Sequence, residues 1–192
     1  MELIVISKET YFESEGKVIN ELFDSGIKIF HLRKPQSDLV SYVKLINEID
    51  PSFHQQLSLH QFHELRSQFD ITRLHYPEME RVAGLRSTAY INSTSIHNLK
   101  ELEDLTQYDY AFFGPVFNSL SKPGYQGIVD QGFKLPPSPL KVIALGGINI
   151  ENVEKVSEMG FDGLALLGAI WGDTKSAIKN FKKIKEICQD LM

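Results

Sequence analysis

The chain has 192 residues, of which 42% are hydrophobic and 23% are charged, and its formal net charge is −5. This balance predicts a single globular domain over residues 1–192 and excludes an intrinsically disordered chain. The acidic net charge argues against a nucleic-acid-binding protein. The single cysteine, Cys188, excludes an intrachain disulfide and a cysteine-rich metal site.

The chain begins without the pattern of a signal peptide, because no basic residue precedes the short apolar run 3–6 and Lys8 follows it closely. The longest apolar stretches, such as 164–171, are too short to cross a membrane. We therefore expect a cytoplasmic protein without a membrane segment.

Short β-type runs alternate with amphipathic helical patterns along the whole chain. The expected strands are 3–6, 28–32, 56–60, 73–76, 88–91, 110–113, 141–145 and 163–167. The expected helices are 17–23, 39–49 (with Ser37 or Asp38 as its N-cap), a short helix ending near 69, 96–105, 150–158 and 176–191. This alternation predicts a (β/α)8 TIM barrel, with a doubly wound open sheet as the alternative.

Glycine turns follow the last two expected strands. Gly146 and Gly147 come after the seventh strand, and Gly168 and Ala169 come after the eighth. In a TIM barrel these loops lie at the carboxyl ends of the strands, where backbone N–H groups and a following helix often bind phosphate. The sequence therefore predicts a phosphate site, although glycines that merely permit tight turns remain the alternative.

Basic and hydroxyl side chains follow two other strands. Ser119, Ser121 and Lys122 lie in the long loop 114–139, and Arg33 and Lys34 follow the second strand. Hydroxyls and cations suit a phosphate or a carboxylate, so these residues predict an anion-attracting mouth of the barrel. The alternative is a solvated surface with no ligand.

Histidines also occur at the expected strand ends. His97 follows the fifth strand, where an imidazole is placed to exchange protons with a ligand in the barrel mouth. His31, His60 and His75 lie at or near other strand ends, but the chain has no short-spacing metal motif such as His-Glu-x-x-His. We therefore expect no metal bound by histidine.

Several of these segments together match a known pattern. They are His31-Leu-Arg33, Ser95-Ile-His97, Phe113-Gly-Pro-Val-Phe-Asn-Ser-Leu-Ser-Lys122, Leu145-Gly-Gly-Ile148 and Leu167-Gly-Ala-Ile170. In these segments the chain resembles the thiamine phosphate synthase and thiazole tautomerase (TenI) superfamily, from the first strand to about Trp171. The resemblance implies a (β/α)8 barrel whose ligand is the phosphorylated, methylated thiazole precursor of thiamine, hereafter thiazole phosphate.

The resemblance also implies roles for individual residues. The phosphate would bind to Gly147 and to the Gly168–Ala169 backbone, beside Gly146, and Lys122 would close the loop over the ligand and act in catalysis with His97. The residues that would bind the rest of the substrate are His31, Arg33, Lys34, His60, Ser119 and Ser121.

The two branches of this superfamily differ in chemistry. The synthase joins hydroxymethylpyrimidine diphosphate to thiazole phosphate and uses Mg²⁺ held by carboxylates. Where the synthase has an Asn-Asp pair this chain has His60-Gln61, and Glu80 is a loose match for a second aspartate. Where the synthase has Arg-Glu-Lys, this chain has Arg33-Lys34-Pro35. Three parts of the diphosphate site are altered together.

The tautomerase branch moves a proton to make the thiazole ring aromatic, and it uses a histidine at the position of His97. This reaction needs no cofactor. The first hypothesis is therefore a thiazole tautomerase, and the alternative is a thiamine phosphate synthase that uses Mg²⁺. A second alternative is a non-catalytic regulator that binds thiazole phosphate or thiamine phosphate. In each case the partner is a small molecule, and a homodimer is the expected assembly.

Overall fold

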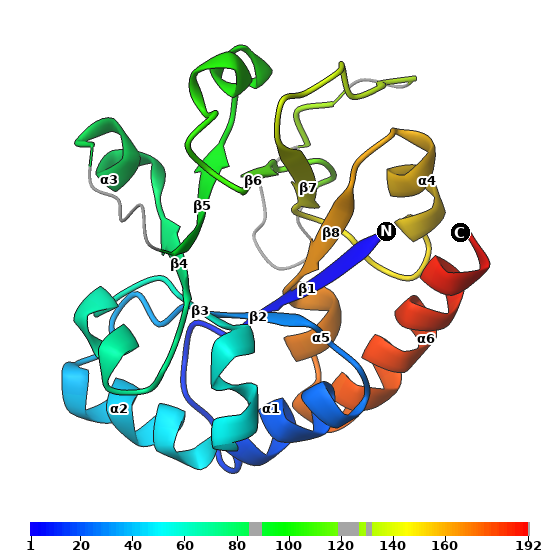
Figure 1. Cartoon of the computed structure of the whole chain (residues 1–192). Coiled ribbons are helices and arrows are strands. Elements are labelled where there is room, and N and C mark those ends of the chain that lie inside the picture. Colours follow the sequence, from blue (N-terminus) through cyan, green and yellow to red (C-terminus); the bar gives the residue numbers. More distant parts are fainter. Residues whose placement is uncertain (85–89, 119–126, 130–131, 192) are drawn as a thin grey trace.

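A computed structural model describes residues 1–84, 90–118, 127–129 and 132–191, and in it eight parallel strands close into a barrel in the order β1 to β8 (Figure 1). The strands are β1 (Glu2–Ile6), β2 (Ile29–Leu32), β3 (Leu57–Leu59), β4 (Arg73–Tyr76), β5 (Ile91–Ile96), β6 (Tyr110–Phe113), β7 (Lys141–Leu145) and β8 (Gly163–Leu166). The predicted (β/α)8 barrel is confirmed, and the open doubly wound sheet is wrong.

The barrel closes where β1 pairs with both β2 and β8. Val5 lies opposite Phe30 on one side and Leu166 on the other. All three side chains are fully buried, because each strand has the inside of the barrel on one face and helices or loops on the other. Short runs of apolar residues therefore form strands here without a polar face.

The α-helices differ in length and in how much of the barrel they cover. They are α1 (Glu15–Asp24), α2 (Leu39–Glu48), α3 (Glu78–Val82), α4 (Val153–Glu158), α5 (Gly168–Trp171) and α6 (Ala177–Asp190). The 3-10 helices are η1 (Pro51–Gln56), η2 (His63–Ser67), η3 (Leu99–Asp104) and η4 (Thr174–Ser176). The longest, α1, α2 and α6, lie along one side of the barrel (Figure 1). Of the two N-caps predicted for α2, Ser37 and Asp38, the structure has Asp38. Its carboxylate accepts a hydrogen bond from the Ser41 amide.

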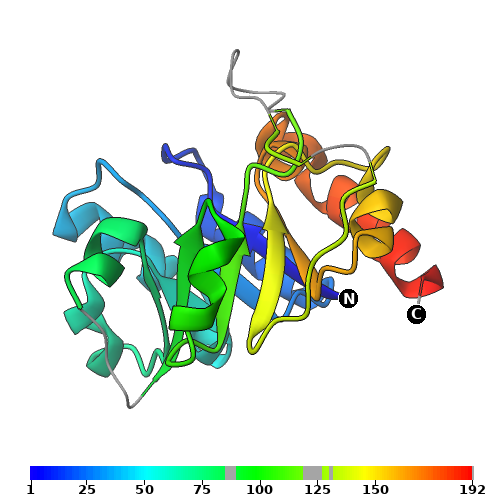
Figure 2. The same cartoon turned by 90° about the horizontal axis from the view of Figure 1, so that it is seen from above.

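The other side of the barrel has less helical cover. Figure 2 shows the green part of the chain, with β5, β6 and η3, next to the yellow strand β7. Between β6 and β7 the described residues contain no helix. Within the described part of the chain, no helix combines the length and apolar character that a membrane crossing needs.

The fifth strand corrects the sequence analysis. The strand expected at 88–91 is displaced: β5 runs from Ile91 to Ile96, Tyr90 lies outside it, and residues 85–89 lie outside the described part. The polar run 93–95 looks like a loop in the sequence, yet its side chains are satisfied inside the fold. The Thr94 hydroxyl donates to the Tyr76 carbonyl, and Ser93 pairs with His75. The predicted helix 96–105 is reduced to η3.

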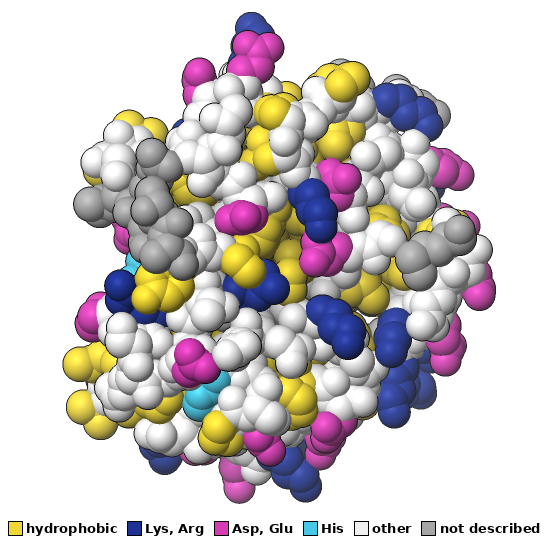
Figure 3. All heavy atoms as spheres, viewed as in Figure 1, with side chains coloured by type: hydrophobic (Ala, Val, Ile, Leu, Met, Phe, Trp, Pro, Cys, Tyr) yellow, Lys and Arg dark blue, Asp and Glu magenta, His cyan; other side chains and the backbone are white. Residues whose placement is uncertain are grey.

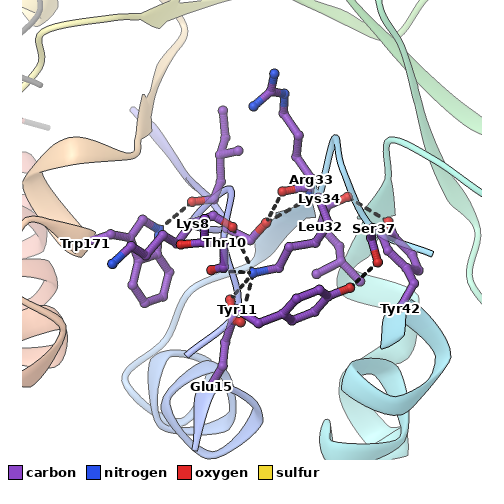
Figure 4. A network of polar contacts seen from close by, with 12 residues as sticks. Lys8, Thr10, Tyr11, Glu15, Leu32, Arg33, Lys34, Ser37, Tyr42 and Trp171 are labelled. Atoms are coloured by element: carbon purple, nitrogen blue, oxygen red, sulfur yellow. Dashed lines mark hydrogen bonds and ion pairs between the residues drawn. The ribbon is translucent and has the colours of Figure 1, made fainter. Parts of the chain in front are cut away.

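Lys34 also corrects the sequence analysis. It was expected at the barrel mouth, but its side chain is fully buried and its ammonium contacts both carboxylate oxygens of Glu15 at 2.7 and 2.8 Å (Figure 4). The ammonium also donates to the carbonyls of Lys8 and Thr10, and it lies over the Tyr11 ring. Four oxygen acceptors offset part of the hydration that the ammonium loses on burial beside α1. Lys34 therefore fastens the loop after β1 and the start of α1 to the end of β2.

Burial changes the acid–base properties of this pair. It lowers the pKa of the Lys34 ammonium and raises the pKa of the Glu15 carboxyl, while the contact between the two groups opposes both shifts. The pair is a structural feature of the fold, and it does not line the pocket described below.

Lys34→Met is expected to lower the free energy of unfolding by about 3–5 kcal/mol, because it leaves the Glu15 carboxylate buried without its cation. Lys17→Met is the matched control, because Lys17 pairs with Glu21 at 3.9 Å on an exposed surface and its loss costs about 0.5 kcal/mol or less. Urea unfolding of both variants measures the difference. Equal destabilisation by the two substitutions would show that the buried pair does not hold the fold together.

Candidate active site

A pocket of about 310 Å³ lies at the carboxyl ends of the strands, on the side of the barrel formed by β1, β2 and β5–β8. Its apolar lining consists of Ile6, Ile96, Phe112, Pro115, Leu145, Ile148, Ala165 and Leu167. Its polar side chains are those of Glu9, Arg33, Ser95 and His97. Hydrophobic side chains also show near the middle of the face in Figure 3, with side chains of both charges around them. A pocket with these features suits a small ligand that has an apolar ring and an anionic group.

The glycine turns predicted to bind phosphate come together in this pocket. Gly146, Gly147, Gly168 and Ala169 all line it. Gly146 and Gly147 have φ angles of 100° and 66°, which favour glycine, and the chain after β6 crosses directly over them. A Cβ added to Gly147 would lie 2.4 Å from the Asn118 carbonyl oxygen. Both positions therefore require glycine, and both glycines line the pocket. The helix that follows Leu167 has four residues, so the phosphate prediction depends on backbone N–H groups more than on a helix dipole.

His97 lies where the sequence predicted, directly after β5, and it lines the pocket. Its Nδ1 is hydrogen-bonded to the carbonyl oxygen of Gly114. Because a carbonyl oxygen only accepts, Nδ1 donates this hydrogen bond, and in the neutral form of the ring the lone pair lies on Nε2. This arrangement gives His97 one nitrogen that can take a proton from a ligand.

Arg33 lies at the rim of the pocket and is paired with Glu9 at 2.7 Å. Ser7 links the loops of both residues, since its hydroxyl donates to the Arg33 carbonyl and accepts from the Arg33 amide. The sequence analysis did not identify Glu9. The sequence does contain a pattern that could have identified Glu9: an acidic residue in the loop directly after the first strand, at the carboxyl end where barrel sites lie.

His31 and His60, expected to bind substrate, lie beneath the pocket and do not line it. Both are buried, and His31 Nδ1 is 2.8 Å from His60 Nε2. His31 Nε2 is also 2.7 Å from the Tyr110 hydroxyl. Because β2 places His31 inside the barrel before the strand ends, its side chain points into the core and not into the mouth. This corrects the expected position of both histidines.

The third buried imidazole of this region is that of His75. Its Nδ1 is 2.9 Å from the Ser93 hydroxyl and its Nε2 is 3.1 Å from the Ser95 hydroxyl. Burial lowers the pKa of all three imidazoles well below the usual histidine value, to about 3 for His75. These three histidines are therefore neutral at physiological pH.

Three predicted site residues, Ser119, Ser121 and Lys122, lie outside the described residues. Their predicted contacts with the ligand stay predictions.

The described residues do not fit a magnesium site. Mg²⁺ prefers carboxylate oxygens, and among the described residues Glu9 is the one carboxylate that lines the pocket. Arg33 already pairs with it. The Gln61 side-chain oxygen accepts a hydrogen bond from the Lys34 amide, and Glu80 lies in α3 outside the pocket lining. The described residues therefore supply no group of carboxylates that could hold Mg²⁺ in the pocket.

Fold and pocket together define the class of protein: a (β/α)8 barrel with a small-ligand pocket built from the loops after β1, β2 and β5–β8. A family model described as "Thiamine monophosphate synthase" matches residues 3–170. The chain belongs to this family.

Relatives in sequence carry the same name. The thiamine-phosphate synthase of Staphylococcus carnosus is 26% identical over 169 residues, which are 80% of each chain. The thiamine-phosphate synthase of Pyrococcus horikoshii is 35% identical over 102 residues, about half of each chain.

Solved structures agree with the fold. The thiamine phosphate pyrophosphorylase of Bacteroides thetaiotaomicron superposes with a TM-score of 0.75 at 25% identity and covers 98% of both chains. That of Pyrococcus furiosus has a TM-score of 0.75 at 17% identity, over 100% of this chain and 96% of the other, which shows a shared fold.

Gly147→Ala is expected to destabilise the protein more than Gly160→Ala. Both glycines have positive φ angles, 66° and 85°, so each substitution strains the backbone by about 1–2 kcal/mol. At Gly147 the new Cβ also meets the chain after β6, whereas nothing lies within 4 Å of a Cβ at Gly160. Thermal or urea unfolding of the two variants measures how much more stability Gly147→Ala loses than Gly160→Ala. Equal destabilisation would mean that the crossing over Gly147 is not tight.

Proposed function

We propose that this protein is a thiamine-biosynthesis enzyme that binds thiazole phosphate in the pocket. The observation that carries the proposal is the convergence of Gly146, Gly147, Gly168 and Ala169 at one end of an otherwise largely apolar pocket. Backbone N–H groups of such turns suit the phosphate, and the apolar lining from β1, β6, β7 and β8 suits a methylated aromatic ring.

For the reaction, we propose the activity in the names of the relatives, the formation of thiamine phosphate from thiazole phosphate and hydroxymethylpyrimidine diphosphate. In this reaction the thiazole nitrogen forms a bond to the pyrimidine methylene carbon, and the bond from that carbon to the diphosphate oxygen breaks. The family model and the relatives support this activity over the tautomerase first expected from the sequence.

The chain's own residues contribute to this reaction in two ways. Arg33, at the rim, places a guanidinium near the pocket, where positive charge stabilises a departing diphosphate. The apolar walls exclude water from the reacting carbon, which favours capture by the thiazole nitrogen over hydrolysis. The substrates would thus share one pocket, with the thiazole phosphate deep on the glycine turns and the diphosphate toward Arg33.

A second candidate function is thiazole tautomerisation, and a specific observation favours it. His97 lines the pocket with its Nε2 lone pair available, since Nδ1 donates to Gly114. A proton moved by one imidazole needs no metal, so the lack of a carboxylate cluster among the described pocket residues does not oppose this reaction.

Incubation with both substrates, with and without Mg²⁺, is expected to yield thiamine phosphate above an enzyme-free background. Arg33→Ala is expected to lower kcat/KM for the diphosphate substrate about tenfold or more, because it removes a charge-assisted contact. Lys17→Ala, on the exposed surface of α1, is the control and is expected to behave as wild type. Product formation is measured by chromatography of the reaction mixture.

Absence of product from a preparation that binds thiazole phosphate by calorimetry would contradict the synthase proposal. Turnover of the thiazole tautomer would then be compared between wild type and His97→Ala. A loss of about 10²–10⁴-fold in the variant would establish the tautomerase. Binding of thiazole phosphate without turnover in either assay would support the third hypothesis, a non-catalytic regulator.

A further inference from the structure

The interior of the barrel beneath the pocket contains a cluster of three buried histidines that the proposed reaction does not use. His31 lies in β2, His60 directly follows β3, and His75 lies in β4, so three neighbouring strands each contribute one imidazole. One ring nitrogen from each residue lies within 4.8 Å of the other two. The inner layers of such barrels are normally filled by branched apolar side chains. Three imidazoles in this position therefore call for a chemical explanation.

We propose that His31, His60 and His75 form a binding site for a transition-metal cation of the Zn²⁺ class inside the barrel. In a tetrahedral site with Zn–N bonds of about 2.0–2.1 Å, neighbouring nitrogens are about 3.4 Å apart. The separation between His31 Nδ1 and His60 Nε2 is 2.8 Å, and no separation in the set exceeds 4.8 Å. The rings of His60 and His75 are stacked, with centroids 4.0 Å apart and planes 20° apart, so both rings must tilt before their nitrogens converge on a metal with that of His31.

The residues around the cluster also suit metal ligands. A histidine that binds a metal through one nitrogen is normally oriented by a hydrogen bond at the other. His31 has such an orienting bond from Nε2 to the Tyr110 hydroxyl. Its Nδ1 is hydrogen-bonded to His60 Nε2, a bond that a metal would replace with the loss of its proton. In His75, Nδ1 is bonded to the Ser93 hydroxyl, and Nε2 contacts the Ser95 hydroxyl, a bond that a metal would replace.

The donor set selects the kind of cation. Neutral imidazoles suit Zn²⁺, Co²⁺, Ni²⁺ and Cu²⁺, and the cluster contains no carboxylate of the kind that Mg²⁺ or Ca²⁺ prefers. The positive charges of Arg73 and Arg33 act on His31 and His60 and therefore disfavour a cation in the cluster. Only a divalent cation that imidazole binds strongly could overcome this repulsion. Three protein ligands leave one tetrahedral position for water.

The pocket lies one layer of side chains away from the cluster. Ser95 and Phe112 both line the pocket, and both contact His75, one through its hydroxyl and the other through stacked rings 5.2 Å apart. Movement of these two side chains would connect the pocket to His75. This site is separate from the phosphate turns of Gly146 and Gly168, so its existence does not depend on the proposed reaction.

The test is titration of the full chain, without a polyhistidine tag and after treatment with a chelator, with Co²⁺ and then Zn²⁺. We expect one equivalent of Co²⁺ to bind with the visible absorption of a tetrahedral site, and Zn²⁺ to displace it. His75→Ala is expected to abolish the absorption. Tyr110→Phe, which removes only the hydroxyl that orients His31, is expected to weaken Co²⁺ binding about 10–100-fold.

The matched control is His63→Ala, which removes a half-buried histidine outside the cluster. It is expected to bind Co²⁺ as wild type does. Folding of each variant is verified by circular dichroism, and His60→Gln replaces His75→Ala if the latter does not fold. No saturable binding by folded wild-type protein, or equal binding by the cluster variants and the control, would overturn the proposal and leave a hydrogen-bonded polar core.

Discussion

Closure of the parallel sheet between β1 and β8 is the constraint on which the rest of the structure depends. Because these two strands pair, the first and last thirds of the chain meet, and Ile6 and Leu167 line the same pocket although they are far apart in sequence. Closure also brings all carboxyl ends of the strands to one rim, where the glycine turns, Arg33 and His97 converge. The indole of Trp171 reinforces the junction by donating to the Ile6 carbonyl. An open sheet would separate these groups.

Two systems of buried polar groups among the described residues have different roles. The Lys34–Glu15 pair lies outside the strands and holds the β1 loop and α1 in place, and so it positions Glu9 and Arg33 without touching the pocket. The histidine cluster lies inside the strands and directly below the pocket floor. Both systems bury groups that cost free energy unless they are paired, and in both the partners come from different strands or loops. The pairing of neighbouring strands and loops therefore determines which of these polar groups are satisfied.

Much of the fold could be predicted from the sequence because apolar, β-branched runs alternate with amphipathic helices, and seven of the eight strands lie close to their expected positions. The exception, β5, has a polar run whose hydroxyls find partners on neighbouring strands, and such partners are not visible in a single segment. Gly146, Gly147 and His97 were predictable because strand ends identify the rim. The direction of the Lys34 and His31 side chains could not be predicted. A shift of one residue along a strand decides whether a side chain points to the mouth, the core or the outer face of the barrel. The expected homodimer stays a prediction.

A crystal structure of the protein with thiazole phosphate tests the central claim most directly. That claim is that the pocket at the carboxyl ends of β5–β8 binds the phosphate on the turns after β7 and β8. We expect the phosphate against the backbone of Gly146, Gly147, Gly168 and Ala169, with the thiazole ring among the apolar side chains and within reach of His97. A ligand bound elsewhere on the barrel, or a phosphate held at the opposite side of the pocket, would contradict this account.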